Sequence, residues 1–153
     1  MSVEYKIHPI GQHNSQVCWI ACYRMLNAWK KQADKLCYDR LKASKIPMDQ
    51  ALNITQWPKA RNAMKLTSHT VSYLKQDDNL GYTLEKYGPM WCAGNFLNGS
   101  GHVILLSGYY PKNNTIRVID PWKVHKGIKS EVWGMDWWRT NIKDAHAACQ
   151  TWY

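Results

Sequence analysis

The chain has little phenylalanine, few acidic residues and no long apolar run. Its 153 residues include one Phe against nine Trp and nine Tyr, and 11 acidic side chains against 20 Lys and Arg, for a formal charge of +9. The longest aliphatic run, 103–106, is far shorter than a membrane span. The first residues also lack the apolar stretch of a signal peptide. These absences predict a soluble protein.

The chain also lacks paired metal-ligand or redox motifs. No Cys-x-x-Cys occurs, and the number of cysteines is odd, which leaves at least one thiol unpaired unless the chain dimerises through it. A zinc site would need clustered Cys and His pairs, which are absent, so we expect no metal and no cofactor. We expect a reducing compartment, the cytoplasm of the producing cell. The five thiols are Cys18, Cys22, Cys37, Cys92 and Cys149.

The length predicts one domain over residues 1–153. The two halves of the chain differ in their residue patterns. Residues 1–80 carry helical patterns, and residues 81–153 carry short β-type runs separated by turn residues. We therefore expect an α+β fold in which a helical half packs on an antiparallel sheet, with a cleft between the two.

The strongest helical pattern is at residues 18–31, apolar on most sides and hence expected at the centre of the fold. Asn14 or Ser15 is the candidate cap at its start. Shorter helices are predicted near 35–44, 57–65 and 69–76, and strands at 90–94, 101–110, 115–119 and 127–133. Residues 135–142 fit a loop or a short helix.

Cys18 is the candidate nucleophile. A thiol attacks as thiolate, which is favoured at a helix N-terminus beside a histidine that can hold the proton. His102, at the start of the 101–108 run, is the candidate base. Asp120 ends the 116–119 run, and a hairpin would bring it beside His102 to fix the imidazole tautomer.

The oxyanion of such a reaction needs hydrogen-bond donors, which the Cys18 backbone N–H and the Gln12 amide could supply. Gln16 is a less favoured substitute. His13 as base and Asp136 as orienting acid are weaker alternatives. A single cysteine on an apolar helix is commonly a small buried hydrophobe, and we expect this of Cys22 and Cys92.

The order of these motifs resembles the papain-like cysteine peptidases. The matching residues are Gln12, then Cys18-Trp19 opening a helix, then Gly101-His102-Val103, then Ile119-Asp120-Pro121-Trp122. The resemblance is narrower to the compact bacterial branch, which includes peptidases that cut leader peptides after a double glycine and secreted effector proteases of plant pathogens. Trp19, where the double-glycine peptidases favour Gly, is nearer the effector proteases.

The resemblance implies a catalytic triad of Cys18, His102 and Asp120, with Gln12 as the oxyanion donor. It implies a cysteine endopeptidase, an interbacterial or host-directed effector toxin that cuts a target protein, plausibly next to glycine. The same scaffold serves a glutamine deamidase, an acyl transferase or a peptidoglycan amidase, and a catalytically inactive binding module is a further alternative.

A basic stretch at residues 30–45 has three interpretations: a solvated helical face, a nucleic-acid surface, or a surface that steers an acidic protein. No nucleic-acid-binding motif accompanies the charge. We expect a protein substrate, an acidic cognate immunity protein and no membrane partner, with a monomer as the default. We also expect delivery to the target-cell cytoplasm by a route that needs no leader. The basic residues are Lys30, Lys31, Lys35, Arg40, Lys42 and Lys45.

Overall fold

The computed structural model describes residues 2–153 and has an α+β architecture. Its helices, in chain order, are α1 (Cys18–Trp29), α2 (Asp34–Ala43), the 3-10 turn η1 (Ile54–Gln56), α3 (Trp57–Met64), α4 (Val71–Leu74), α5 (Asn79–Tyr87), α6 (Pro121–Val124) and α7 (Met135–Asn141). None of the helices within residues 2–153 has the length and apolar composition that a membrane span requires.

The strands of residues 2–153 form one seven-stranded sheet. They are β1 (Val3–Glu4), β2 (Thr67–Ser68), β3 (Met90–Leu97), β4 (Ser100–Tyr110), β5 (Thr115–Ile119), β6 (Glu131–Gly134) and β7 (Cys149–Thr151). The order across the sheet is β2-β7-β3-β4-β5-β6, β1 also pairs with β4, and every pairing is antiparallel.

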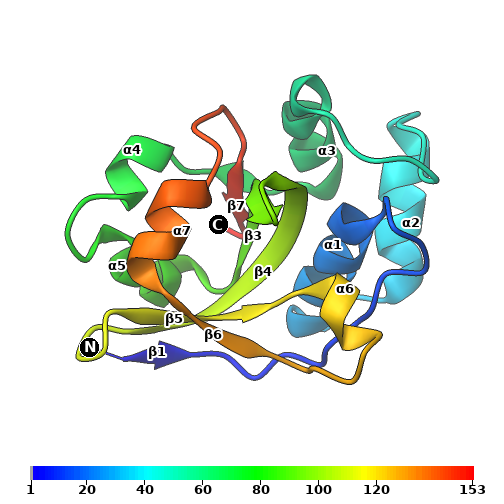
Figure 1. Cartoon of the computed structure of the whole chain (residues 1–153). Helices are drawn as coiled ribbons and strands as arrows, with labels where there is room; N and C mark the ends of the chain where they lie inside the picture. Colours follow the sequence, from blue (N-terminus) through cyan, green and yellow to red (C-terminus); the bar gives the residue numbers. More distant parts are fainter. Residues whose placement is uncertain (1) are drawn as a thin grey trace.

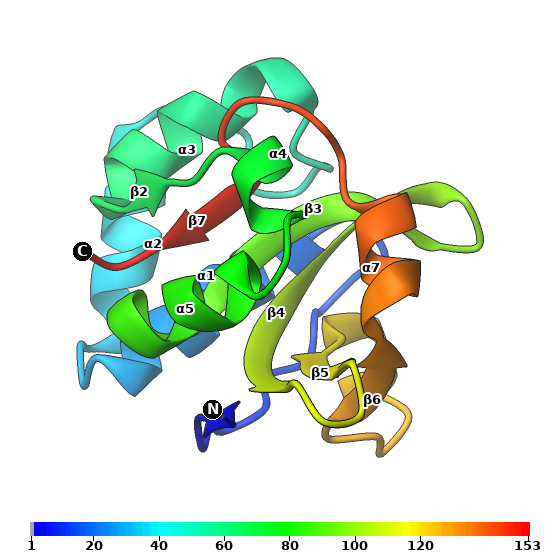
Figure 2. The ribbon, with the colours of Figure 1, turned by 90° about the vertical axis from the view of Figure 1, so that its left-hand side faces the viewer.

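Helices flank the long hairpin of β3 and β4 on two sides. In Figure 1, α1, α2 and α3 lie to one side of β4, and α4, α5 and α7 lie to the other. The turned view of Figure 2 shows the tip of the β3–β4 hairpin reaching out beyond the body of the sheet. The hairpin therefore stands between helices α1, α2 and α3 and helices α4, α5 and α7.

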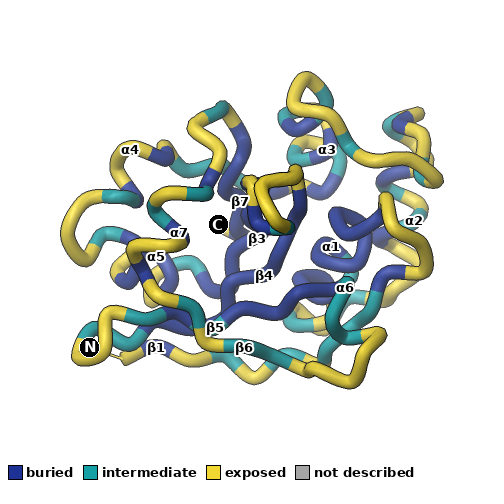
Figure 3. Tube along the Cα trace, viewed as in Figure 1, coloured by how far each residue is buried: buried dark blue, intermediate teal, exposed yellow. Residues whose placement is uncertain are grey.

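Helix α1 is the buried central helix that its apolar pattern predicts. Nine of its 12 residues are buried, and the tube is dark along this helix and along β3 and β4 in Figure 3. The contact between α1 and β3 is formed by the aromatic side chains of Trp19, Tyr23 and Trp91. The Tyr23 ring stacks on Trp91 at 5.2 Å between centroids, and the Tyr23 hydroxyl donates to Gln150 Oε1 at 2.7 Å. The stacked pair and its hydrogen bond fix the position of the helix on the sheet.

Several predicted elements are corrected by the structure. Neither Asn14 nor Ser15 caps α1: the N-cap is Val17, without a side-chain hydrogen bond, and Asn14 Oδ1 instead accepts from the Gln16 backbone N–H at 2.8 Å. The strand predicted at 127–133 is β6, at Glu131–Gly134. Residues 135–141 form helix α7, the second of the two alternatives.

Three short strands, the helices α5 and α6 and the 3-10 turn η1 were not predicted. Helix α5 contains Gly81, the residue at which we expected the helical half to end. Helical structure instead continues to Tyr87. Strands β1, β2 and β7 have only two or three residues each, too few for a period-2 pattern to be recognised. The predicted α+β fold, with the helical half packed on an antiparallel sheet, is nevertheless confirmed.

Candidate active site

The structure brings Cys18 to the β4 residues at 102–103. Cys18 is the first residue of α1, so its backbone N–H belongs to the unpaired donors of a helix N-terminus. The Val103 backbone N–H donates to Cys18 Sγ at 3.4 Å. His102, the residue before Val103, lines the same cavity as Cys18. The sulfur is therefore held between the start of α1 and the first residues of β4.

His102 is bonded to Asp120 on its other side. His102 Nε2 lies 2.6 Å from Asp120 Oδ1, and both residues are buried. The β4–β5 register explains the contact, because Leu105 pairs with Ile119 and the next residue along, Asp120, falls opposite Ile104 on the face that carries His102. A carboxylate that accepts from Nε2–H leaves Nδ1 free for the thiol. The hairpin geometry that the sequence predicts for these two residues is thus present.

The pKa of His102 is raised from its ordinary value of 6.5 to about 9. Burial by itself lowers the pKa of this imidazole, but the hydrogen bonds and negative charge of Asp120 and Cys18 outweigh it. The imidazole therefore remains protonated at neutral pH. A cationic imidazole beside a sulfur is the arrangement that favours a thiolate.

Asp120 is fixed by the helix that follows it. It is the N-cap of α6, and Oδ1 accepts a second hydrogen bond from the Trp122 backbone N–H at 3.0 Å. Pro121 stands at the first helical position, where its missing N–H costs nothing. Asp before Pro is a helix-start signal, and sequence reasoning, which treated Asp120 only as a strand end, did not use it.

Gln12 is buried, with 1% of its surface exposed, and its side chain is held locally. Gln12 Nε2 donates to the Asn14 carbonyl at 2.7 Å, and the Gln12 backbone N–H donates to the Pro121 carbonyl at 3.3 Å. Its loop is therefore tied to the segment that carries Asp120. One hydrogen of the Nε2 amide remains available, since the group carries two. Gln16, in contrast, is exposed and lines the cleft beside Cys18.

The two weaker alternatives are placed elsewhere. His13 is exposed in the loop before α1, and no hydrogen bond joins it to Cys18 among the described residues. Asp136 lies in the first turn of α7 and pairs with Arg139 at 3.1 Å, with its side chain 85% exposed. Neither of them replaces His102 or Asp120 at the sulfur.

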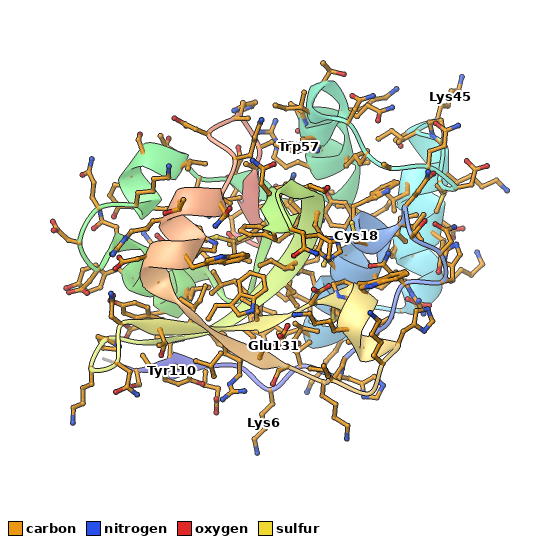
Figure 4. All side chains as sticks on the ribbon, in the orientation of Figure 1. Lys6, Cys18, Lys45, Trp57, Tyr110 and Glu131 are labelled. Atoms are coloured by element: carbon orange, nitrogen blue, oxygen red, sulfur yellow. The ribbon has the colours of Figure 1, made fainter. Side chains whose placement is uncertain are left out.

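The cavity beside Cys18 and His102, with a volume of about 320 Å³, is here called the Cys18 cleft. Its lining includes Cys18 and also Trp57, which begins α3; both residues are labelled in Figure 4. Most of its wall is apolar. The apolar lining consists mainly of Trp19, Leu52, Ile54, Trp57, Ala93 and Val103. Sequence reasoning named the candidate reactive groups but not this wall, which comes from four separate segments of the chain.

Cys18 differs from the other four thiols in exposure. It is 8% exposed, whereas each of the others is 0% exposed and none is disulfide-bonded within residues 2–153. Burial raises the pKa of Cys22 and Cys92 well above the ordinary range and that of Cys37 to about 12. These three thiols therefore stay protonated and unreactive, and the expectation that Cys22 and Cys92 are buried is confirmed. Within the described residues, no cluster of three potential metal ligands occurs.

The fold and this cleft place the chain in the class of papain-like proteins. A solved structure, the crystal structure of a double glycine motif protease from an AMS/PCAT transporter in complex with the leader peptide, has the same fold with a TM-score of 0.60. The two chains are 17% identical, and the match covers 97% of this chain and 94% of that one.

The family is given by a sequence model. The model described as "Papain-like cysteine protease AvrRpt2" matches residues 2–143, and the chain belongs to this family of cysteine proteases. A comparison with curated protein sequences finds no significant match. The resemblance to papain-like cysteine proteases that the sequence motifs indicate is thereby confirmed.

Proposed function

We propose that the protein is a cysteine endopeptidase in which Cys18 is the nucleophile, His102 the proton carrier and Asp120 the orienting acid. The observation that carries this proposal is the position of His102, which is bonded to Asp120 at 2.6 Å and lines the same cavity as Cys18. Membership in a family of cysteine proteases supports the same assignment.

The reaction follows from these positions. Cys18 Sγ attacks the scissile carbonyl carbon as thiolate, and the oxygen becomes an oxyanion that accepts from the Cys18 backbone N–H and from the second Nε2 hydrogen of Gln12. Protonated His102 gives its proton to the leaving amine as the C–N bond breaks, which leaves a thioester on Cys18. Neutral His102 then takes a proton from water, the resulting hydroxide attacks the thioester, and the acid is released.

The substrate is a polypeptide, because a second cavity of about 570 Å³ adjoins the Cys18 cleft. Asn95 lines both cavities. The second cavity contains the aromatic cluster of Phe96, Trp133 and Trp137, with ring centroids 4.6–5.8 Å apart. Trp137 is 43% exposed. Two adjoining cavities of this kind suit an extended chain better than a small molecule.

The residue at the cut is small, and glycine fits best. Cys18 is only 8% exposed and lies between the start of α1 and the edge of β4. A bulky side chain on the attacked residue would meet these two elements before its carbonyl reached the sulfur. The apolar wall of Trp19, Leu52 and Trp57 instead receives a neighbouring side chain of the substrate.

The test is a search for new N-termini. Incubating the protein with a cell lysate in reducing buffer, and labelling free α-amines, is expected to give a set of new N-termini that share a small residue before the cut. A His102→Ala variant serves as the control and is expected to give none. Glutamine residues converted to glutamate without any new N-terminus would instead identify a deamidase and contradict the proposal.

We infer an effector role from the motifs that the sequence shares with effector proteases. The producing cell keeps the protein in its cytoplasm, and the protein is delivered to the cytoplasm of the target cell. The five unbridged thiols suit two reducing compartments. Toxicity on expression in the cytoplasm, and not only on export, is the result that this role requires.

An acidic partner is proposed for the basic surface of residues 30–45, which run from the end of α1 to just beyond α2. Lys30, Lys31, Lys42 and Lys45 are exposed, and Lys45 points away from the molecule in Figure 4. Because the net charge is +9, an acidic immunity protein would be steered to this face. Acidic products of neighbouring genes are expected to bind in a pull-down and to lose about tenfold in association rate when Lys42 and Lys45 become Glu. Failure of every acidic neighbour to bind would contradict this proposal.

A further inference from the structure

Lys143 carries a positive charge into the wall of the Cys18 cleft. It follows α7, and it lines the same cavity as Cys18 and His102. Of the residues in 2–153 that line this cavity, none is acidic. Asp120 is buried behind His102 and is not part of the wall. The cleft therefore offers two cations, Lys143 and the His102 imidazolium, and no carboxylate.

The position of Lys143 is set by backbone contacts to β3. Its backbone N–H donates to the Ala93 carbonyl at 3.1 Å, and the preceding Ile142 forms an antiparallel bridge with Gly94. Gly94 permits this close approach, since a Cβ there would lie 2.5 Å from the Asn141 carbonyl oxygen. The segment that carries Lys143 is thus fixed against the strand whose residues 93–95 form the floor of the cleft.

The Lys143 ammonium has no salt-bridge or hydrogen-bond partner among residues 2–153. The salt bridges found within residues 2–153 do not include it. The basic residue that lines the second cavity, Lys123, is by contrast already engaged, because its Nζ donates to Glu131 Oε1 at 2.7 Å. An unpaired cation at the wall of a substrate cleft is a ready site for an anion carried by the substrate.

We propose that Lys143 is a specificity-determining residue that binds the side-chain carboxylate of an Asp or Glu in the substrate. The acidic residue lies on the side of the scissile bond that occupies the Cys18 cleft, next to the apolar side chain received by Trp19 and Trp57. This inference rests on the proposed peptidase function. Because Lys143 is exposed, the preference for an acidic residue over its amide is expected to be about three- to tenfold in kcat/KM.

The test compares cleavage-site profiles on a peptide library. Wild type is expected to show Asp and Glu enriched at one position, Lys143→Gln to lose that enrichment, and Lys143→Glu to favour Lys and Arg there. Lys112→Glu is the matched control, because it makes the same charge change in the β4–β5 turn. Acidic enrichment that persists in Lys143→Glu, or that is absent from wild type, overturns the proposal.

A second measurement needs no turnover and separates this proposal from the peptidase function. Iodoacetate and iodoacetamide both alkylate Cys18, and only the first brings a carboxylate into the cleft. The rate with iodoacetate divided by the rate with iodoacetamide is expected to fall several-fold in Lys143→Glu and to stay unchanged in Lys112→Glu. An unchanged ratio in Lys143→Glu overturns the role of Lys143. If wild type produced no new N-termini at all, the peptidase function would be wrong, whereas this ratio would still decide on Lys143.

Discussion

Replacing Cys18 by serine is expected to abolish peptide-bond cleavage, with a loss of about 10⁴- to 10⁶-fold in kcat. The hydroxyl of serine is far harder to ionise than a thiol, and His102 is placed to pair with a thiolate. The variant is expected to fold, because serine is nearly isosteric with cysteine and its Oγ can accept from the Val103 N–H as Sγ does. Initial rates on the best library peptide, together with thermal melting curves, measure both outcomes.

Cys37→Ala is the control for this experiment. Cys37 is fully buried in α2, and burial raises its pKa to about 12, so removing its thiol is expected to cost some stability but no chemistry. In cells, Cys18→Ser is also expected to remove the toxicity proposed above, and Cys37→Ala to keep it. Wild-type activity in Cys18→Ser, or labelling by iodoacetamide that is no faster at Cys18 than at the buried thiols, would contradict a nucleophilic role.

The three candidate residues at the sulfur could be predicted because each has a local signal. Cys18 begins a strongly apolar helix, His102 begins a long β run, and Asp120 follows the next one. The short connection of Pro111–Asn114 then forces a hairpin, and its register places His102 and Asp120 on one face. Their convergence needs only neighbouring elements and one long-range contact, that of α1 with β4.

The cleft wall and Lys143 could not be predicted in the same way. Lys143 reaches the cleft through a single bridge between Ile142 and Gly94, which are 48 positions apart and carry no pattern that pairs them. Helix α5 was missed because Gly81 lowers its helix propensity. Its fully buried Leu80 and Leu84, four residues apart, show that packing against the sheet outweighs that preference.

Replacing Asp120 by alanine is expected to lower kcat about 10²- to 10⁴-fold. The His102 Nε2–H loses its acceptor, so the imidazole can rotate and adopt the tautomer that does not serve the thiol. The same change removes the cap of α6, because Trp122 N–H loses Oδ1, at a cost of about 1 kcal/mol. Cleavage rates measured at equal concentrations of folded wild type and variant separate the loss of catalysis from the loss of stability.

Asp120→Asn separates the charge of this side chain from its hydrogen bonds. The amide oxygen of Asn can still accept from His102 Nε2 and from the Trp122 N–H, so orientation and cap are kept. The negative charge is lost, and the pKa of His102 is expected to fall from about 9 toward its ordinary 6.5. We therefore expect Asp120→Asn to retain far more activity than Asp120→Ala near pH 6, and to lose it at a lower pH than wild type.

The raised pKa of His102 sets the direction in which activity and stability change with pH. The imidazolium persists until the pH approaches about 9, so the alkaline limb of kcat/KM for wild type is expected there. The stability linked to this proton is fully present below about pH 6.5 and is lost as the pH rises through about 9. In Asp120→Asn both the alkaline limb and this loss of stability should move to lower pH together. Profiles that coincide with wild type would show that the carboxylate charge does not act on His102, and the proposed triad would then lack its orienting acid.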